Sequence, residues 1–334
     1  MNNLRFILIL SLMISCLYGN AQTDTLGLVR TEKDTITYFI DMSDLLGLRL
    51  YFLRKSNNLE ITNKNQTLRL KPNGLLVLGV GFNYKSIGIG IGFGIPNTAT
   101  SNQKKGKTNQ FDLQFSVYGK SIGVDGFLQI YKGYYNTNPN DFVDWPSDTL
   151  PQLPKMKIIS AGVSAFYIFN ADKFSYKASF VRNQVQNKSA GSVALGFFGN
   201  YDEVKTSGGF IPHEFPDSLK SEFDLSAFRA LSLGIYAGYM YSFVLSKKFF
   251  INLAALPGFG VREIKITKLD NQTESEIKPA PQLLARSAFG FENQNFYITI
   301  SASIIVRSFE YKKFELDLST EQFRLTFGKR FNVK

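Results

Sequence analysis

The sequence contains very few of the residues on which metal sites and thiol chemistry depend. Its 334 residues include one cysteine, Cys16, and one histidine, His213. A disulfide needs two cysteines, and zinc sites usually combine several cysteines or histidines, so the sequence predicts neither. Beyond the first twenty or so residues there is also no apolar run of about 18–20 residues, the length that a membrane-spanning helix needs. With 31 Phe and 16 Tyr, the chain is too aromatic to be disordered.

The N-terminus is typical of a secretory signal peptide over residues 1–21. Arg5 supplies a positive start, residues 6–17 supply an apolar stretch, and a small-residue cleavage site ends at Ala21. The Met-Ile-Ser-Cys run that ends at Cys16 loosely resembles a lipobox, so processing as a lipoprotein is an alternative. We therefore expect an exported protein, and cleavage after Ala21 would leave a mature chain without cysteine.

From residue 74 onward, bulky apolar residues alternate with glycine, serine, threonine and isolated charges. We count twelve such segments, at 74–84, 86–95, 110–118, 121–132, 156–169, 173–182, 190–202, 228–245, 248–264, 282–292, 295–309 and 321–333. Most have the length of a tilted membrane strand. The pattern predicts an all-β fold, a closed antiparallel transmembrane β-barrel of about 12 strands (range 10–14), with lipid on its bulky face. We assign 74–334 to the barrel, and 22–73 to a periplasmic or strand-extending segment that includes a possible extra hairpin.

The long polar connections are predicted extracellular loops, at 96–109, 133–155, 203–227 and 265–281. Short turns should all lie on the periplasmic side of such a barrel. When the crossings are counted back from the C-terminus, however, the short turns before residue 175 fall on the extracellular side. A missing or extra crossing between about 171 and 227 would remove this conflict, so the strand count is uncertain by about two.

Three stretches of the sequence carry a resemblance to a known family. They are Lys71-Pro72-Asn73 followed by residues 78–85, then residues 186–192, and residues 238–245 together with 248–250. They resemble a family of Gram-negative outer-membrane β-barrel proteins of unknown function, over most of the mature chain. The resemblance implies a barrel in the outer membrane, and it implies no activity, cofactor or catalytic residue.

Charged residues recur on the predicted lumen face. The candidates are Arg262, Arg286, Arg307, Arg324 and Arg330 on the last four strands, and Asp112 and Asp125 on the third and fourth, with Glu292 nearby. Facing lipid at mid-depth, each would cost about 2–4 kcal/mol. An arginine wall opposite an acidic wall would favour polar or anionic solutes in a small passive channel.

The alternative is a closed structural or binding barrel that acts through its loops. In that case arginine–carboxylate pairs and tyrosine hydroxyls would simply satisfy one another in a plugged lumen. The glycines of the first two strands favour open space, whereas Arg286 together with Phe127, Phe166 and Tyr236 favours a filled interior. The sequence leaves both readings open.

An enzyme would have to use His213, oriented by Glu214 or Asp217, as some outer-membrane hydrolases use a histidine. No serine lies in a nucleophile-elbow context, so we expect no catalysis, metal or cofactor. The expected partners are outer-membrane lipid and lipopolysaccharide, the barrel-assembly machinery and a small solute that the sequence does not identify. Lys104, Lys105 and Lys107 form one basic outer loop that would suit lipopolysaccharide. Nucleic acid is not expected despite a net charge of +11, because the charges are scattered and the protein is exported.

Overall fold

Strands make up most of the chain that the computed structural model describes, which is residues 37–332 without positions 65, 86 and 247. The strands are β1 (Phe39–Asp41), β2 (Leu45–Asn63), β3 (Gln66–Lys71), β4 (Leu76–Tyr84), β5 (Ile87–Ile95), β6 (Asn109–Tyr118), β7 (Ile122–Asn136), β8 (Gln152–Ile168), β9 (Gln184–Gln186), β10 (Ala190–Lys205), β11 (Leu225–Val244), β12 (Phe249–Lys268), β13 (Thr273–Pro279), β14 (Gln282–Glu292), β15 (Phe296–Tyr311) and β16 (Phe314–Asn332). Short helices lie between them, at α2 (Ala99–Lys105), η2 (Pro139–Asp141), α3 (Tyr176–Phe180) and α4 (Asp217–Glu222). In these described residues, no helix is both long and apolar enough to span a membrane. The expected signal peptide and the lipobox at Cys16 lie outside the described residues.

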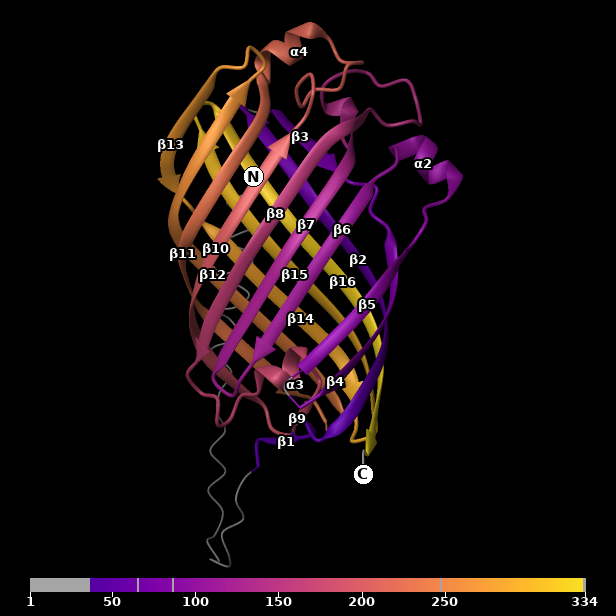
Figure 1. Ribbon diagram of the computed structural model, residues 1–334, viewed down its shortest axis with the longest axis vertical. Coiled ribbons are helices and arrows are strands. Elements are labelled where there is room, and N and C mark those ends of the chain that lie inside the picture. The colour runs from indigo at the N-terminus through magenta and orange to yellow at the C-terminus, as the bar shows by residue number, and fades with distance from the viewer. Residues whose placement is uncertain (1–36, 65, 86, 247, 333–334) are drawn as a thin grey trace, which may run out of the picture. The chain divides into compact units, whose positions relative to one another are not determined.

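Ten of the strands close into a ring through backbone hydrogen bonds (Figure 1). Their order is β2, β16, β15, β14, β12, β11, β10, β8, β7 and β3, which returns to β2. β2 makes the closure, because β16 pairs antiparallel with its whole length and β3 pairs with its last residues, from Leu59. The predicted closed antiparallel barrel is therefore confirmed. The ring of ten lies within the expected range, and the count of twelve is not confirmed.

The remaining strands extend the sheet beyond this ring. β4 pairs with the first half of β2 and carries β5 on its other edge, while β6 pairs with β7. β13 pairs with the second half of β12. Among the described residues, β5 pairs only with β4 and β6 only with β7, so each presents one edge without a partner strand.

The alternation predicted for the strands is visible in their burial. On β10, Val193, Leu195 and Phe197 are exposed on the outer face, whereas Ala194 and Phe198, on the opposite face, are buried inside. Leu231, Leu233 and Ile235 repeat this on β11, and Phe111, Leu113 and Phe115 are exposed on the outside of β6. Successive side chains of a strand point to opposite faces, so the period of two in the sequence becomes an apolar outside around a mixed interior.

Residues 173–182 do not form the predicted strand. They contain α3, which begins after Ser175, whose hydroxyl accepts a hydrogen bond from the N–H of Ala178 at 2.9 Å. The apolar alternation of Phe174 and Tyr176 has another cause, because both side chains are buried inside the barrel. Because residues 173–182 do not cross the barrel, the chain makes one crossing fewer in this region than the sequence predicts. The short turns before residue 175 then fall on the same side as the later ones. The sequence places this missing or extra crossing between residues 171 and 227.

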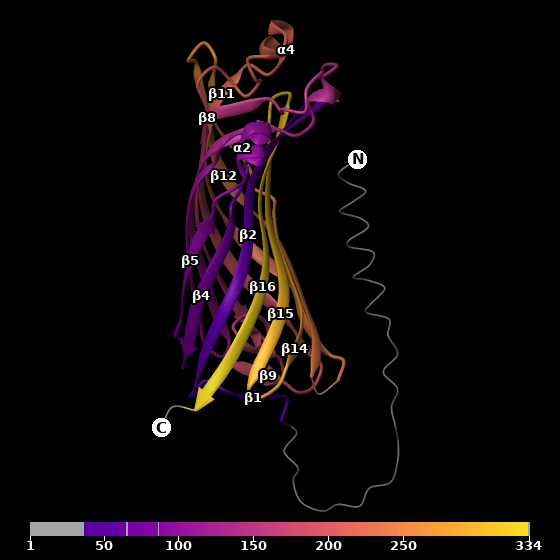
Figure 2. The ribbon, with the colours of Figure 1, turned by 90° about the vertical axis from the view of Figure 1, so that its right-hand side faces the viewer.

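Residues 45–71 form β2 and β3 and belong to the barrel wall, so the wall begins before residue 74. The long connections carrying α2 and α4 lie at one end of the barrel (Figure 2). β1, β9 and the last residues of β16 lie at the other end. We call these the upper and lower ends, as in Figure 1.

Candidate functional site in the lumen

The upper part of the lumen is filled by an apolar cluster that the long connections complete. Phe210, Phe215 and Phe223 come from the connection between β10 and β11, and each is at most 3% exposed. Phe223 packs against Phe314 of β16, with ring centroids 6.2 Å apart, and Phe142 from the β7–β8 connection packs against Phe223. The connections therefore fold into the barrel and close this end.

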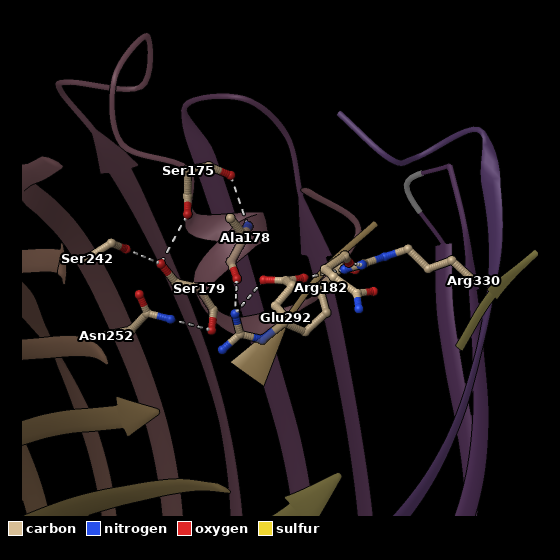
Figure 3. Close-up of polar contacts among 9 residues, drawn as sticks. Ser175, Ala178, Ser179, Arg182, Ser242, Asn252, Glu292 and Arg330 are labelled. Carbon is tan, nitrogen blue, oxygen red and sulfur yellow. Dashed lines mark hydrogen bonds and ion pairs between the residues drawn. The ribbon is translucent and has the colours of Figure 1, made fainter. Parts of the chain in front are cut away.

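The lower part is filled by α3 and the residues that flank it. The Tyr176 ring lies 5.1 Å from that of Phe166 on β8 and 4.9 Å from that of Tyr118 on β6, measured between centroids. Ser179 holds the helix to the wall, because its hydroxyl lies 2.9 Å from that of Ser242 and its carbonyl accepts from Asn252 at 3.2 Å (Figure 3). This inserted helix replaces the strand that the sequence predicted.

The inward glycines make room for aromatic rings. A Cβ atom added at Gly79 would lie 2.1 Å from the Tyr51 ring, and one at Gly328 would lie equally close to Tyr297. Gly90, on β5, also faces the Tyr51 hydroxyl, 3.1 Å from where its Cβ would stand. The glycines that favoured open space in the sequence thus accommodate Tyr51, and the lumen beside them is occupied.

Three ion pairs, which we call the charged belt, lie in the interior between these clusters. Arg307 lies 3.0 Å from Asp202, and both are almost fully buried. Arg286 contacts Asp125 at 2.8 Å, across the barrel from β14 to β7. Lys55 on β2 contacts Asp112 on β6. A buried charge is tolerated when it is paired, so the belt neutralises most of the predicted lumen charges.

A second group of charges gathers beneath α3 (Figure 3). Arg330 and Arg182 both contact the carboxylate of Glu292, Arg182 at 3.4 Å. Arg330 also donates to the backbone carbonyl of Arg182 at 2.8 Å. Arg182 has φ 72°, a left-handed conformation that favours glycine at the end of a helix. Burial lowers the pKa of Arg182 to about 10, so it remains a cation at neutral pH.

A cavity of about 50 Å³ opens between α3 and strands β2, β14, β15 and β16. We call it the arginine cavity; its polar lining includes Arg49, Arg182, Tyr297, Thr299, Arg324 and Thr326. Four buried donors at these residues lack an acceptor, namely Arg49 Nε, Arg182 Nη2, Arg324 Nε and the Tyr297 hydroxyl. Among the described residues, neither Arg49 nor Arg324 forms an ion pair; the Arg324 guanidinium instead lies 5.1 Å from the centroid of the Tyr51 ring.

The structure brings the predicted lumen residues inside the barrel but divides them between different roles. Arg286, Arg307, Asp112 and Asp125 belong to the charged belt, and Arg330 belongs to the group around Glu292. Arg262 bonds to the Ser232 hydroxyl at 2.7 Å and to the Ser308 carbonyl at 2.9 Å. Only Arg324 lines the arginine cavity. Sequence reasoning missed Arg49, Lys55, Arg182 and Asp202; for Asp202, inward alternation on β10 was the available signal.

A family model described as "Domain of unknown function (DUF4421)" matches residues 32–331. The chain belongs to this family. No curated protein matches it in sequence.

Solved structures that resemble this chain include several barrel proteins. The outer membrane protease OmpT from Escherichia coli has 6% sequence identity and a TM-score of 0.40, with 92% of this chain and 99% of that chain covered. OprG, an outer membrane protein from Pseudomonas aeruginosa, has 10% identity and a TM-score of 0.26, with coverage of 88% and 99%. Ail, the attachment invasion locus protein of Yersinia pestis, solved with the heparin analogue sucrose octasulfate, has 12% identity and a TM-score of 0.24, with coverage of 85% and 99%.

The residues considered for catalysis lie apart from the lumen in this DUF4421 protein. The His213 side chain is 86% exposed, and its Nδ1 lies 3.1 Å from Glu214. Asp217 is bonded to Lys220 instead. In the part of the chain that the structure describes, no group of three or more His, Cys, Asp or Glu is placed to hold a metal ion.

Proposed function

We propose that this protein is an outer-membrane β-barrel with a closed lumen, and that it acts as a structural or binding protein rather than as a passive channel. The observation that carries the proposal is the filling of the lumen from both ends. The upper connections supply Phe210, Phe215 and Phe223, and the lower connection supplies α3. A barrel of about eight strands has an interior that wall side chains alone can fill, and a wider one is closed by loops or a helix, as the upper connections and α3 do here.

The outer surface supports a membrane location. The exposed residues of β4, β6, β10 and β11 include long rows of Leu, Ile, Val and Phe, which water would not favour and lipid would. The long connections would then lie outside the cell and the short turns in the periplasm. Insertion would need the barrel-assembly machinery, after export directed by the N-terminal signal peptide.

Lipopolysaccharide remains the proposed partner of the upper end. Lys104 and Lys105 end α2, and the neighbouring Lys107 follows in the same loop. Lys104 lies 3.2 Å from Asp148, but Asp148 is 92% exposed, so this ion pair is weak. The loop can therefore exchange that contact for an anionic headgroup.

We propose further that twelve strands close the wall in the membrane. The upper ends of β4 and β6 are already joined, because the N–H of Leu75 donates to the Gln110 side chain at 3.1 Å. The unpaired edges of β5 and β6 follow below this contact. Each unsatisfied amide in lipid costs several kcal/mol, so the two antiparallel edges gain by pairing with each other.

Cysteine pairs test this closure in a chain expressed without residues 1–21, which removes Cys16 and leaves no other cysteine. Ile91→Cys on β5 is combined in turn with Leu113→Cys, Phe115→Cys or Val117→Cys on β6, and disulfides are detected by gel mobility in vesicles. Pairing of the edges predicts efficient cross-linking at one position and little at the others. Failure of every pair to cross-link would leave the ring at ten strands.

The closed lumen is tested by recording currents from the refolded barrel in a planar bilayer. Folding is first checked by heat-dependent gel mobility, and we expect such folded protein to give no discrete conductance steps. Steps with reversal potentials that favour anions would overturn the proposal in favour of the second candidate, a channel for anionic or polar solutes. The uncompensated arginines of the cavity are the observation that favours this second candidate.

An outer-membrane hydrolase is the least supported candidate. The exposed His213 has a carboxylate neighbour, Glu214, as a general base would require, but the described contacts supply no nucleophile. His213→Ala should leave hydrolysis of ester and peptide substrates unchanged, and a loss of any such activity would restore this candidate.

A further inference from the structure

The arginine cavity holds more positive charge than the protein neutralises. Arg49, Arg182 and Arg324 line it, and Arg330 lies beside Arg182. Among the described residues, Glu292 is the single carboxylate that forms an ion pair with any of these four arginines. The group therefore keeps a formal excess of three positive charges in the interior of the barrel.

The cavity also presents hydrogen-bond donors that nothing accepts. Tyr297 is 1% exposed and Arg182 is 6% exposed, and each has a donor without an acceptor. Arg49 and Arg324 each add an unpartnered Nε. Buried donors without acceptors are rare in folded proteins, because each loses its bond to water and gains nothing in return.

The donors and the space fit a small oxyanion. The guanidinium group presents a planar fork of N–H donors, which matches the oxygens of phosphate, sulfate or carboxylate. The threonine hydroxyls of Thr299 and Thr326 can add further donors from β15 and β16. The cavity volume of about 50 Å³ exceeds the roughly 10–15 Å³ that one water molecule needs.

We propose that the arginine cavity binds a phosphate-class oxyanion. The inference rests on the proposed closed lumen, since in an open pore these arginines would only line the path of a passing ion. The left-handed backbone of Arg182 also supports the oxyanion site. A residue other than glycine is strained in this conformation, and here the strained residue is one whose side chain lines the cavity.

The first experiment measures binding of inorganic phosphate and sulfate to the refolded barrel, in a phosphate-free detergent and at constant ionic strength. Equilibrium dialysis with labelled anions should give saturable binding near one per chain, and the melting temperature should rise with anion concentration. Arg49→Gln and Arg324→Gln should each weaken binding about tenfold or more. Arg54→Gln is the matched control, because Arg54 lies on β2 but is exposed, and it should bind as the wild type does.

A second arm distinguishes a free anion from a lipid headgroup with the same chemistry. The same variants are compared in vesicles of neutral lipid and in vesicles that contain phosphatidylglycerol. If inorganic phosphate stabilises the wild type more than Arg324→Gln in neutral lipid, the bound group is a free anion. If the wild type is more stable than the variant only in vesicles that contain phosphatidylglycerol, the bound group is a lipid headgroup.

Absence of saturable binding in both arms would overturn the oxyanion site and leave a cavity filled with water. The conductance recordings separate this failure from failure of the closed lumen. A silent barrel that binds no anion contradicts only the site, whereas discrete conductance steps contradict the closed lumen itself. Heat-dependent gel mobility shows that each variant is folded, so a variant that fails to fold is not counted as one that fails to bind.

Discussion

The charged belt and the arginine cavity lie in the same lumen, but in the described residues the arginines of the belt have carboxylate partners and most of those in the cavity do not. Arg307 on β15 meets Asp202 at 3.0 Å and is fully buried. Arg324, on the neighbouring strand β16, has no carboxylate partner among the described residues and lies over the Tyr51 ring. A buried arginine that is paired with a carboxylate needs no other partner and can be part of the packing. A buried arginine without a carboxylate instead indicates a site for an external anion.

The largest expected effect comes from breaking a pair in the belt. Arg307→Met should destabilise the barrel by about 3–5 kcal/mol, because it leaves the buried Asp202 without its counter-charge. Urea unfolding of the refolded protein in lipid vesicles measures this change. A loss of less than about 1 kcal/mol would show that Asp202 is neutralised by another group. The pairing of Arg307 would then not distinguish the belt from the cavity.

Removing both partners should cost much less. The double variant Arg307→Met with Asp202→Leu replaces the pair by apolar side chains of similar size, which is often close to neutral for buried pairs. We expect it to recover most of the stability lost in Arg307→Met, as measured by the same unfolding experiment. If the double variant is no more stable than the single one, Arg307 acts through contacts other than Asp202.

The wall was largely predictable from the sequence, because alternation in a strand depends only on the nearest residues. Inward arginines such as Arg307 and Arg324 followed directly from that alternation. α3 did not, because Phe174 and Tyr176 alternate as strand residues do, but Phe174 lies just before the helix and Tyr176 within it, and both pack into the lumen. β2 was also less clear, since its inward face carries polar residues such as Lys55 between its apolar ones.

The pairing of the charges could not be predicted in the same way. Arg286 on β14 meets Asp125 on β7 from across the ring, and only the closed barrel brings these two strands face to face. Arg182 reaches the cavity from a connection that looked like a strand. Which arginines remain without a carboxylate is thus a property of the tertiary structure, and it separates the cavity from the belt.

A smaller effect is expected in the cavity when no anion is present. Arg324→Gln removes a charge that repels Arg49 and Arg182, so in buffer without oxyanions the variant should be about as stable as the wild type or slightly more so. This is the reverse of the result expected for Arg307→Met, and urea unfolding in chloride buffer compares the two directly. A large loss of stability in Arg324→Gln would mean that Arg324 is structural and that the difference between belt and cavity does not hold.

The smallest effect is expected where a charge is paired but only half-buried at the surface. Glu274 on β13 contacts Lys312 and Lys268, the latter at 3.1 Å, and accepts a hydrogen bond from Tyr311 at 2.6 Å. The hydrogen bond with Lys312 contributes most to lowering the pKa of Glu274 to about 2, below its ordinary value of 4.5.

Because the folded state favours the carboxylate, these contacts stabilise the protein fully above pH 4.5, and their contribution is lost as the pH falls toward 2. Glu274→Gln should therefore be slightly less stable than the wild type at pH 7, and this difference should shrink below pH 4.5. Thermal unfolding of both proteins at pH 7, 4.5 and 3 measures it. An effect at pH 7 as large as that of Arg307→Met would show that pairing itself, and not burial, sets the cost of losing a charge in this barrel.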